Sequence, residues 1–179
     1  MTDSIVAALW VDLLGKLAGP AAHAVNNALN NVAINLALVQ SRANTSAAAA
    51  YAERADGYLL EATRLAQAVM ALARPVPVPV EPASVLHQLV PVIRAADRVV
   101  EIRDEMAHAV TTPIDGAAVR LVLAAALADD GANRVHVIRG GEEVQVEGGG
   151  VPADVADAAR RAGIGLRVEP AQVTFTFPT

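Results

Sequence analysis

A helical segment near the start of the chain sets four polar side chains on one face. The segment is AHAVNNALNNVAINLALVQ, residues 22–40. These side chains are His23 and the three asparagines that follow it at offsets of three, four and seven residues, Asn26, Asn27 and Asn30. Residues at these offsets are neighbours on a helix surface. The face lies roughly opposite Val25 and Val32, so we expect His23 to point to solvent.

An exposed imidazole on such a face suggests phosphoryl chemistry. Imidazole is a nucleophile near neutral pH, and it can take a phosphoryl group from an aspartyl phosphate on another protein. Amide side chains beside it can hydrogen-bond an anion without adding a charge that repels phosphate. The same spacing also fits a solvated helix face that holds one histidine by chance, and spacing alone leaves both interpretations open.

The composition narrows the class of partner. The chain has 179 residues, enough for one medium domain or two small ones. Its formal net charge is −5, from 14 Lys and Arg against 19 Asp and Glu, and it has no basic run. This balance argues against a nucleic acid or an anionic membrane as partner. There are no cysteines, which excludes disulfides, thiolate zinc sites and thiol catalysis.

The N-terminal stretch predicts the location of the protein. MTDSIVAALWVDLLGKLAG is apolar in part, but Asp3, Asp12 and Lys16 interrupt the pattern of a signal peptide or a membrane span. We therefore expect a cytoplasmic protein with no membrane partner.

Two long helical patterns occupy the first part of the chain. They are separated by RANTS, residues 42–46, where Asn44, Thr45 or Ser46 can cap the second helix. The second pattern has apolar residues at alternating steps of four and three, typical of a heptad seam. The seam residues are Tyr51, Ala55, Tyr58, Ala62, Leu65, Val69 and Leu72. The first pattern has a matching seam at Val25, Ala28 or Leu29, Val32, Leu36 and Val39.

The two helices should form an antiparallel hairpin, because the turn between them is short. Gly19 and Pro20 predict a kink or a restart of the first helix. Further apolar residues widen the stripe of the second helix: Leu59, Ala66, Met70 and Ala73. A lone hairpin cannot cover such wide faces, so we expect a homodimer that forms a four-helix bundle.

Beyond this region the sequence pattern changes. RPVPVPVEP, residues 74–82, is rich in proline and marks a boundary. Ser84 can cap a helix that runs to about Asp97. The pattern then predicts a strand at 99–103, a helix at about 115–128, a hairpin of RVHVIR and EEVQVEG across Gly140 and Gly141, a short helix at 152–161, and closing strands in GLRVEP and QVTFTFP. This part reads as one layer of helices on a mixed sheet.

The run H-A-V-N-N-A-L, His23 to Leu29, resembles the phosphoacceptor box of bacterial two-component sensor histidine kinases. In that box an acidic residue, an aliphatic, two polar residues, Pro or Ala, and Leu follow the histidine. The stretch AVMALARP, followed by PVEPASVLHQLVPVIRAADRVVEIR, is similar to the way these kinases pass from their dimerisation hairpin into the ATPase-like domain. The resemblance runs from about residue 15 to the end and is strongest in the hairpin.

The resemblance implies an α+β fold in three parts. Residues 1–74 form the helical hairpin that dimerises and carries the phosphoacceptor His23, residues 75–82 are a linker, and residues 83–179 form a small degenerate ATPase-like α/β sandwich. Asn27 falls where the family places a Thr or Asn that helps to position the phosphoryl group, and Asn26 matches the preceding polar position.

Several positions depart from the family. The acidic residue after the histidine is Ala24, which puts autophosphorylation in doubt. Ala124 and Ala128 stand where an asparagine would ligate magnesium, and Val146 stands where an aspartate would recognise adenine, although Gly148 and Gly150 are present. Asp129 and Asp130 more often form a solvated turn than a cation site. We therefore expect neither ATP nor a resident metal.

A kinase-like frame of this kind resembles the histidine phosphotransferases that relay a phosphoryl group between aspartates of response-regulator receiver domains. The resemblance implies that His23 is the acceptor, that Asn26, Asn27 and Asn30 assist, and that the receiver brings its own magnesium. Two alternatives stay open. One is a non-catalytic regulator that binds a receiver or a kinase, and the other is an ATP-dependent kinase with a reduced site.

The remaining polar candidates have ordinary interpretations. His87, His108 and His136 fit surface or packing positions, and no His and Glu spacing typical of zinc occurs. Trp10 belongs to an apolar face that we expect to pack on the bundle or on a partner subunit.

Overall fold

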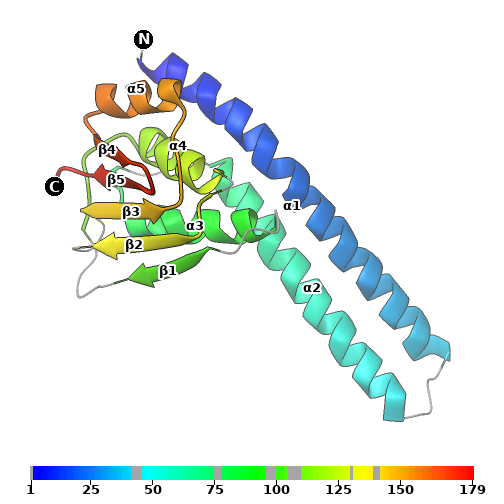
Figure 1. Ribbon diagram of the computed structural model, residues 1–179. Coiled ribbons are helices and arrows are strands. Elements are labelled where there is room, and N and C mark those ends of the chain that lie inside the picture. The colour runs from blue at the N-terminus through cyan, green and yellow to red at the C-terminus, as the bar shows by residue number, and fades with distance from the viewer. Residues whose placement is uncertain are drawn as a thin grey trace.

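The computed structural model describes residues 2–41, 46–74, 78–95, 100–104, 110–129, 131–138 and 142–179. Two long helices lie side by side and extend away from a compact part built of shorter helices and a sheet (Figure 1). The elements are α1 (Thr2–Ser41), α2 (Ser46–Leu72), α3 (Pro82–Arg94), β1 (Glu101–Asp104), α4 (Gly116–Leu127), β2 (Arg134–Ile138), β3 (Glu143–Glu147), α5 (Ala153–Arg161), β4 (Gly165–Glu169) and β5 (Gln172–Thr176).

The five strands form a single mixed sheet in the order β1-β2-β3-β5-β4. β1 pairs parallel with β2, and the other pairs are antiparallel. Alternate residues of β2 and β3 are fully buried against the helices: Val135, Val137, Val144 and Val146. The predicted α+β class, with helices followed by a mixed sheet, is confirmed. The pairing of β2 with β3 is also as predicted, while Gly140 and Gly141 lie outside the described residues.

α1 runs through Pro20 as one continuous helix, so of the two predicted outcomes the restart is wrong and the kink stays a prediction. Proline removes one backbone hydrogen bond and normally disfavours a helix interior. Here Leu17 and Ala21, on either side of the proline, are both buried in the core. Packing on both sides of the proline therefore overrides the local penalty.

The contact between α1 and α2 follows the predicted seam on α2 but not entirely on α1. Every predicted seam residue of α2 is buried or half-buried. On α1, Leu29 and Leu36 are instead exposed, by 44% and 47%. The buried positions there are seven residues apart: Ala21, Ala28 and Asn35. Small side chains let the helices approach closely, and the Asn35 amide donates to the Asn31 carbonyl at 2.8 Å, so the buried amide is satisfied.

The structure shows how two of the shorter helices begin. Asp115 caps α4, because its side chain accepts a hydrogen bond from the Ala117 amide at 3.1 Å; the sequence placed the start of this helix at about residue 115 but named no cap. α3 begins at Pro82, with Glu81 as its cap residue, so the predicted cap at Ser84 is wrong. Proline is favoured in the first helical turn, where its missing N–H has no helical partner. The turn at 42–45 and the side chain of Ser46 lie outside the described residues.

One hydrophobic core includes residues of the long helices and of the compact part with the sheet. It includes the early α1 residues Val6, Leu13 and Leu17 together with residues of α3, α4, α5 and the sheet. Beyond the proline-rich stretch, Val80 pairs with Thr112 through two backbone hydrogen bonds of 2.9 and 2.7 Å. The division into residues 1–74, 75–82 and 83–179 stays a prediction.

α1 is also long and apolar enough to span a membrane, judged by length and composition. Core helices of water-soluble proteins pass the same test. The prediction of a cytoplasmic protein with no membrane partner is therefore neither supported nor contradicted by this helix.

A buried arginine of α4 ties the long helices to the sheet. The Nη1 atom of Arg120 donates to the Leu72 carbonyl, and its Nη2 atom donates to the Arg74 carbonyl at 2.8 Å. The guanidinium also lies 5.3 Å from the ring centroid of Trp10 on α1. Burial lowers the pKa of Arg120. The predicted packing role of Trp10 is confirmed, but its arginine partner was not foreseen.

We expect Arg120→Met to destabilise the fold by roughly 2–4 kcal/mol, because two carbonyls at the end of α2 lose their buried donor. The measurement is urea unfolding followed by circular dichroism. Arg161→Met, at an exposed site on α5, is the control and should change stability by less than about 0.5 kcal/mol. Equal effects of the two substitutions would contradict this role for Arg120.

Candidate functional site

The candidate site lies on the middle of α1. His23, Asn26, Asn27 and Asn30 are all exposed, so the structure brings the four predicted residues onto one open helix face. The buried face of the same helix, marked by Ala21 and Ala28, turns toward α2. A protein partner can therefore reach the imidazole without any rearrangement of the core. The chemical role of the four residues stays a prediction.

One large apolar side chain joins this face. Ile34 lies eleven residues after His23, which on a helix brings it back to nearly the same direction, about three turns away. Its side chain is 58% exposed. The helical spacing that placed Asn27 and Asn30 beside His23 also identifies Ile34, but sequence reasoning had not singled it out.

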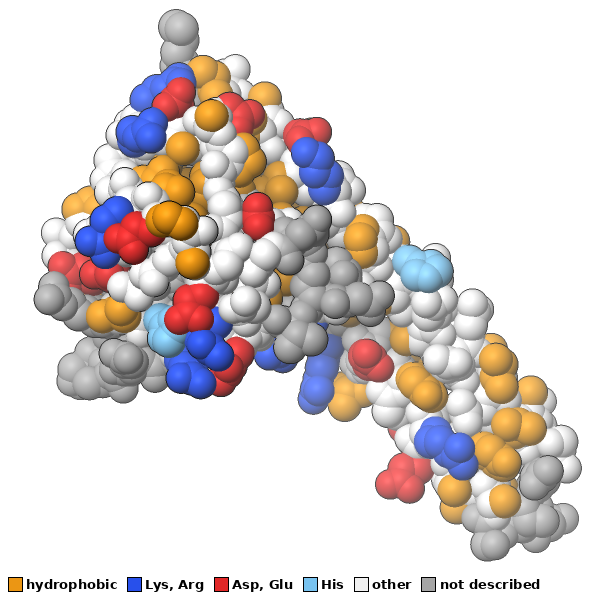
Figure 2. Space-filling model, in the orientation of Figure 1, with side chains coloured by type: hydrophobic (Ala, Val, Ile, Leu, Met, Phe, Trp, Pro, Cys, Tyr) orange, Lys and Arg blue, Asp and Glu red, His pale blue; other side chains and the backbone are white. Residues whose placement is uncertain are grey.

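A second apolar strip flanks the site. Leu29 and Leu36 on α1 are exposed, as are Leu59 and Met70 on α2, by 48% and 56%. Figure 2 shows hydrophobic side chains gathered along the outer half of the long helices. Exposed leucine and methionine at helical spacing are typical of a surface that another chain covers.

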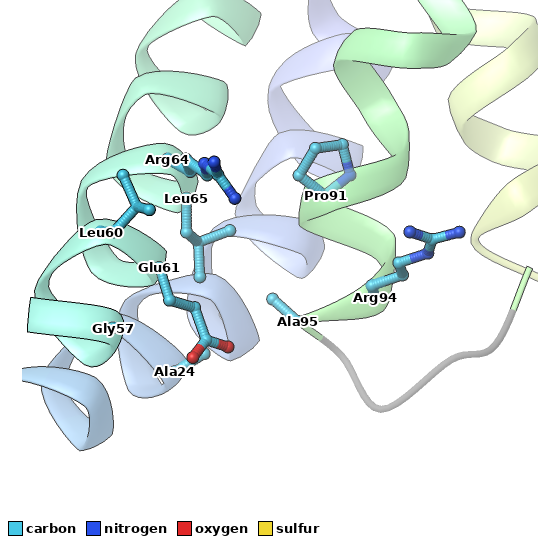
Figure 3. Close-up of a pocket in the computed structure, with 9 residues that line it drawn as sticks. All are labelled: Ala24, Gly57, Leu60, Glu61, Arg64, Leu65, Pro91, Arg94 and Ala95. Atoms are coloured by element: carbon cyan, nitrogen blue, oxygen red, sulfur yellow. The ribbon is translucent and has the colours of Figure 1, made fainter. Parts of the chain in front are cut away.

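The residue next to the histidine faces inward. Ala24 is half-buried and lines a groove of about 460 Å³ between α1, α2 and α3 (Figure 3). A methyl group therefore stands at the position where the resemblance drawn from the sequence would place a carboxylate. Glu61 of α2 is a carboxylate in the same groove.

The glycine turn after β3 has a packing explanation. Gly148 has φ of 72°, and a Cβ atom there would lie 2.0 Å from the Gly131 carbonyl oxygen. A Cβ atom on Gly150 would lie 3.0 Å from a carboxylate oxygen of Asp129. The two segments approach backbone to backbone, so only glycine fits at Gly148. Val146 and Ala124, where the resemblance drawn from the sequence would place nucleotide-binding side chains, are fully buried in the core.

Asp129 acts within its own turn. Its Oδ1 atom accepts a hydrogen bond from the Gly131 amide at 3.0 Å, which is the geometry of a capped turn. Asp130 lies outside the described residues. Among the residues that the structure describes, no group of three or more His, Asp or Glu side chains is arranged to hold a metal ion.

α1 also packs beside this turn. A cavity of about 260 Å³ is lined on one side by residues of α1 such as Leu9, Leu13 and Lys16, and on the other by Ala128, Asp129 and Pro152. Lys16 pairs with Asp12 at 2.8 Å, and this carboxylate raises the pKa of Lys16. The cavity holds three carboxylates, from Asp12, Asp129 and Asp154, against this one lysine.

His136 lies on the sheet and belongs to a network of charged side chains. His136 on β2 contacts Glu147 at 3.0 Å, and Glu147 also pairs with Arg134 at 2.8 Å. Arg134 extends this network to Glu101, whose pKa is lowered by Arg103 and then by Arg134. This is a surface network of paired charges on the sheet, in line with the packing interpretation of His136.

His87 is exposed on α3, as its surface interpretation predicted, and His108 lies outside the described residues.

We expect Gly148→Ala to destabilise the protein by roughly 2–4 kcal/mol, because the new methyl group combines a left-handed backbone with a backbone clash. Gly15→Ala is the matched control, since no atom lies within 4 Å of its added Cβ inside α1. There the substitution should stabilise by roughly 0.5–1 kcal/mol. Thermal unfolding of both variants checks the pair, and a tolerated Gly148→Ala would contradict the packing explanation.

Comparisons with known proteins identify no family. No family model matches the chain, and no curated protein matches its sequence. A solved structure described as a bacterial phosphotransferase is similar to this chain at 14% identity and a TM-score of 0.49, covering 94% of this chain and 96% of that one. A likeness at this level does not assign an activity to this chain.

Proposed function

We propose that this protein is a histidine phosphotransferase that relays a phosphoryl group to or from receiver aspartates through His23, without binding ATP. The observation on which the proposal rests is the exposed His23 on α1, flanked by exposed amides within the box H-A-V-N-N-A-L. The partner is a response-regulator receiver domain.

The transfer needs few groups from this chain. The unprotonated ring nitrogen of His23 attacks the phosphorus of the aspartyl phosphate, the P–O bond to the aspartate breaks, and the carboxylate leaves as an N–P bond forms. The proton on the other ring nitrogen stays on the ring or passes to solvent. Asn27 donates hydrogen bonds to the phosphoryl oxygens, with Asn26 and Asn30 assisting. The receiver supplies the aspartate and its magnesium.

Features around His23 favour a relay over a kinase. The base that a kinase would use is replaced by Ala24, which packs in a groove instead. The region that would hold the nucleotide has a buried Val146, and α1 packs beside it. The excess of carboxylates there would repel a triphosphate. Transfer from phosphohistidine to a receiver requires neither a base next to the histidine nor a bound nucleotide.

We expect His23→Ala to abolish phosphoryl uptake from a phosphorylated receiver, because it removes the accepting nitrogen. The measurement is transfer of acid-labile label from each receiver domain of the source genome. His87→Ala, another exposed histidine, should leave uptake unchanged. Asn27→Ala should slow transfer roughly ten- to hundredfold. Incubation with ATP alone should give no label, and uptake that persists in His23→Ala would overturn the proposal.

The apolar strip supports a homodimer as the working form. Burying each leucine of the strip contributes roughly 1.5–3 kcal/mol. Leu29→Asp combined with Leu36→Asp should therefore shift the protein from dimer to monomer in light scattering at micromolar concentration. Ile34→Asp, on the face of His23, should remain dimeric and weaken transfer by the receiver. A wild-type monomer at these concentrations would contradict the dimer.

A second function, a non-catalytic regulator that binds a receiver or a kinase, is favoured by Ala24 alone. Tight receiver binding that survives His23→Ala, together with no acid-labile phosphate on the wild type, would support this alternative over the relay.

A further inference from the structure

The groove between α1, α2 and α3 has the dimensions of a ligand site. Its volume of about 460 Å³ falls within the roughly 300–1,000 Å³ typical of small-molecule sites, which occur preferentially between helices and at junctions between parts of a fold. Its apolar lining comes from Leu60, Leu65, Pro91 and Ala95. Leu60 is 51% exposed at this groove, so an apolar surface is left open there.

Charged groups in the groove are few and differ in their availability. Arg64 and Glu61 both line it, and neither has an ion pair among the residues that the structure describes. Figure 3 shows the guanidinium of Arg64 extending from α2 toward Pro91. Arg94 lines the groove from α3, but its guanidinium donates to the Val100 carbonyl at 3.3 Å. Arg64 therefore has its guanidinium donors available, whereas the guanidinium of Arg94 extends from α3 away from Arg64 (Figure 3).

We propose that this groove binds a small organic anion, a carboxylate or a phosphate ester attached to an apolar body. The guanidinium of Arg64 matches the geometry of both oxyanions. The apolar body would lie on Leu65, Pro91 and Ala95. Arg64 supplies the available cation of the groove, and Glu61 is the carboxylate that lines it. His23 does not line the groove, so the site does not depend on the proposed relay.

The ligand would contact α2 and α3 together. Because these helices belong to the long helix pair and to the compact part, a bound anion would stabilise their relative position. The opposite charges of Arg64 and Glu61 allow two tests of the affinity for an anion. Removing Arg64 should weaken an anion, and removing the charge of Glu61 should strengthen it.

The test uses the full chain and three probes that share one ring system: 1-naphthoate, 1-naphthyl phosphate and the neutral 1-naphthalenemethanol. Titration calorimetry gives affinities, and amide NMR shifts locate the site. We expect the anions to bind more tightly than the alcohol and to shift the amides of Ala24, Leu65 and Ala95. The stronger of the two anions identifies the oxyanion class.

Single substitutions test whether Arg64 binds the anion. Arg64→Gln should raise the Kd of the anions roughly tenfold or more, while Glu61→Gln should lower it. Arg54→Gln, exposed on the same helix, is the matched control and should leave it unchanged. The inference is overturned if the alcohol binds as tightly as the anions, if Arg64→Gln binds like the wild type, or if the shifted amides surround Leu29 and Leu59 instead. Arg64 is exposed and has no side-chain hydrogen bond or ion pair among the described residues, so loss of folding should not obscure the result.

Discussion

The packing of the long helices against α4 depends on how Arg120 closes the end of α2. The last carbonyls of a helix carry a partial negative charge and lack intrahelical donors. Arg120 donates to the carbonyls of Leu72 and Arg74 from inside α4, and Trp10 of α1 covers the guanidinium. One buried cation therefore joins both long helices to the helix that packs on the sheet. Without it, the end of α2 would be buried with unsatisfied acceptors.

The two halves of α1 differ in what they pack against. The first half packs in the common core through Val6, Leu13 and Leu17. The second half packs chiefly on α2 and leaves His23 and its amides exposed. The early part of α1 and Arg120 thus tie the compact part to the long helices, while the second half of α1 keeps an open face.

Local rules predicted most elements and failed where tertiary contacts oppose them. The seam of α2, the alternation of β2 and β3, and the start of α4 near Asp115 each depend on a repeat or a side chain within a few residues. The continuity of α1 through Pro20, the exposure of Leu36 and the burial of Arg120 depend on segments far apart in the sequence. A single sequence contains no local signal for such contacts. At the site, too, helix geometry within α1 predicted the open face of His23. It could not predict the groove beside Ala24, which depends on contacts with α2 and α3.

The turn after β3 shows that a glycine can be required by the backbone conformation alone, without any role in binding. Gly148 must be glycine because its backbone has positive φ and touches Gly131, whatever the protein binds. Val146, two residues earlier, fills the core where a polar side chain would be needed to recognise a base. A resemblance based on the glycines alone therefore reflects how the chain turns after β3. The function must instead be argued from side chains that reach solvent, and the proposal made for His23 starts from its exposed imidazole and the exposed amides beside it on α1.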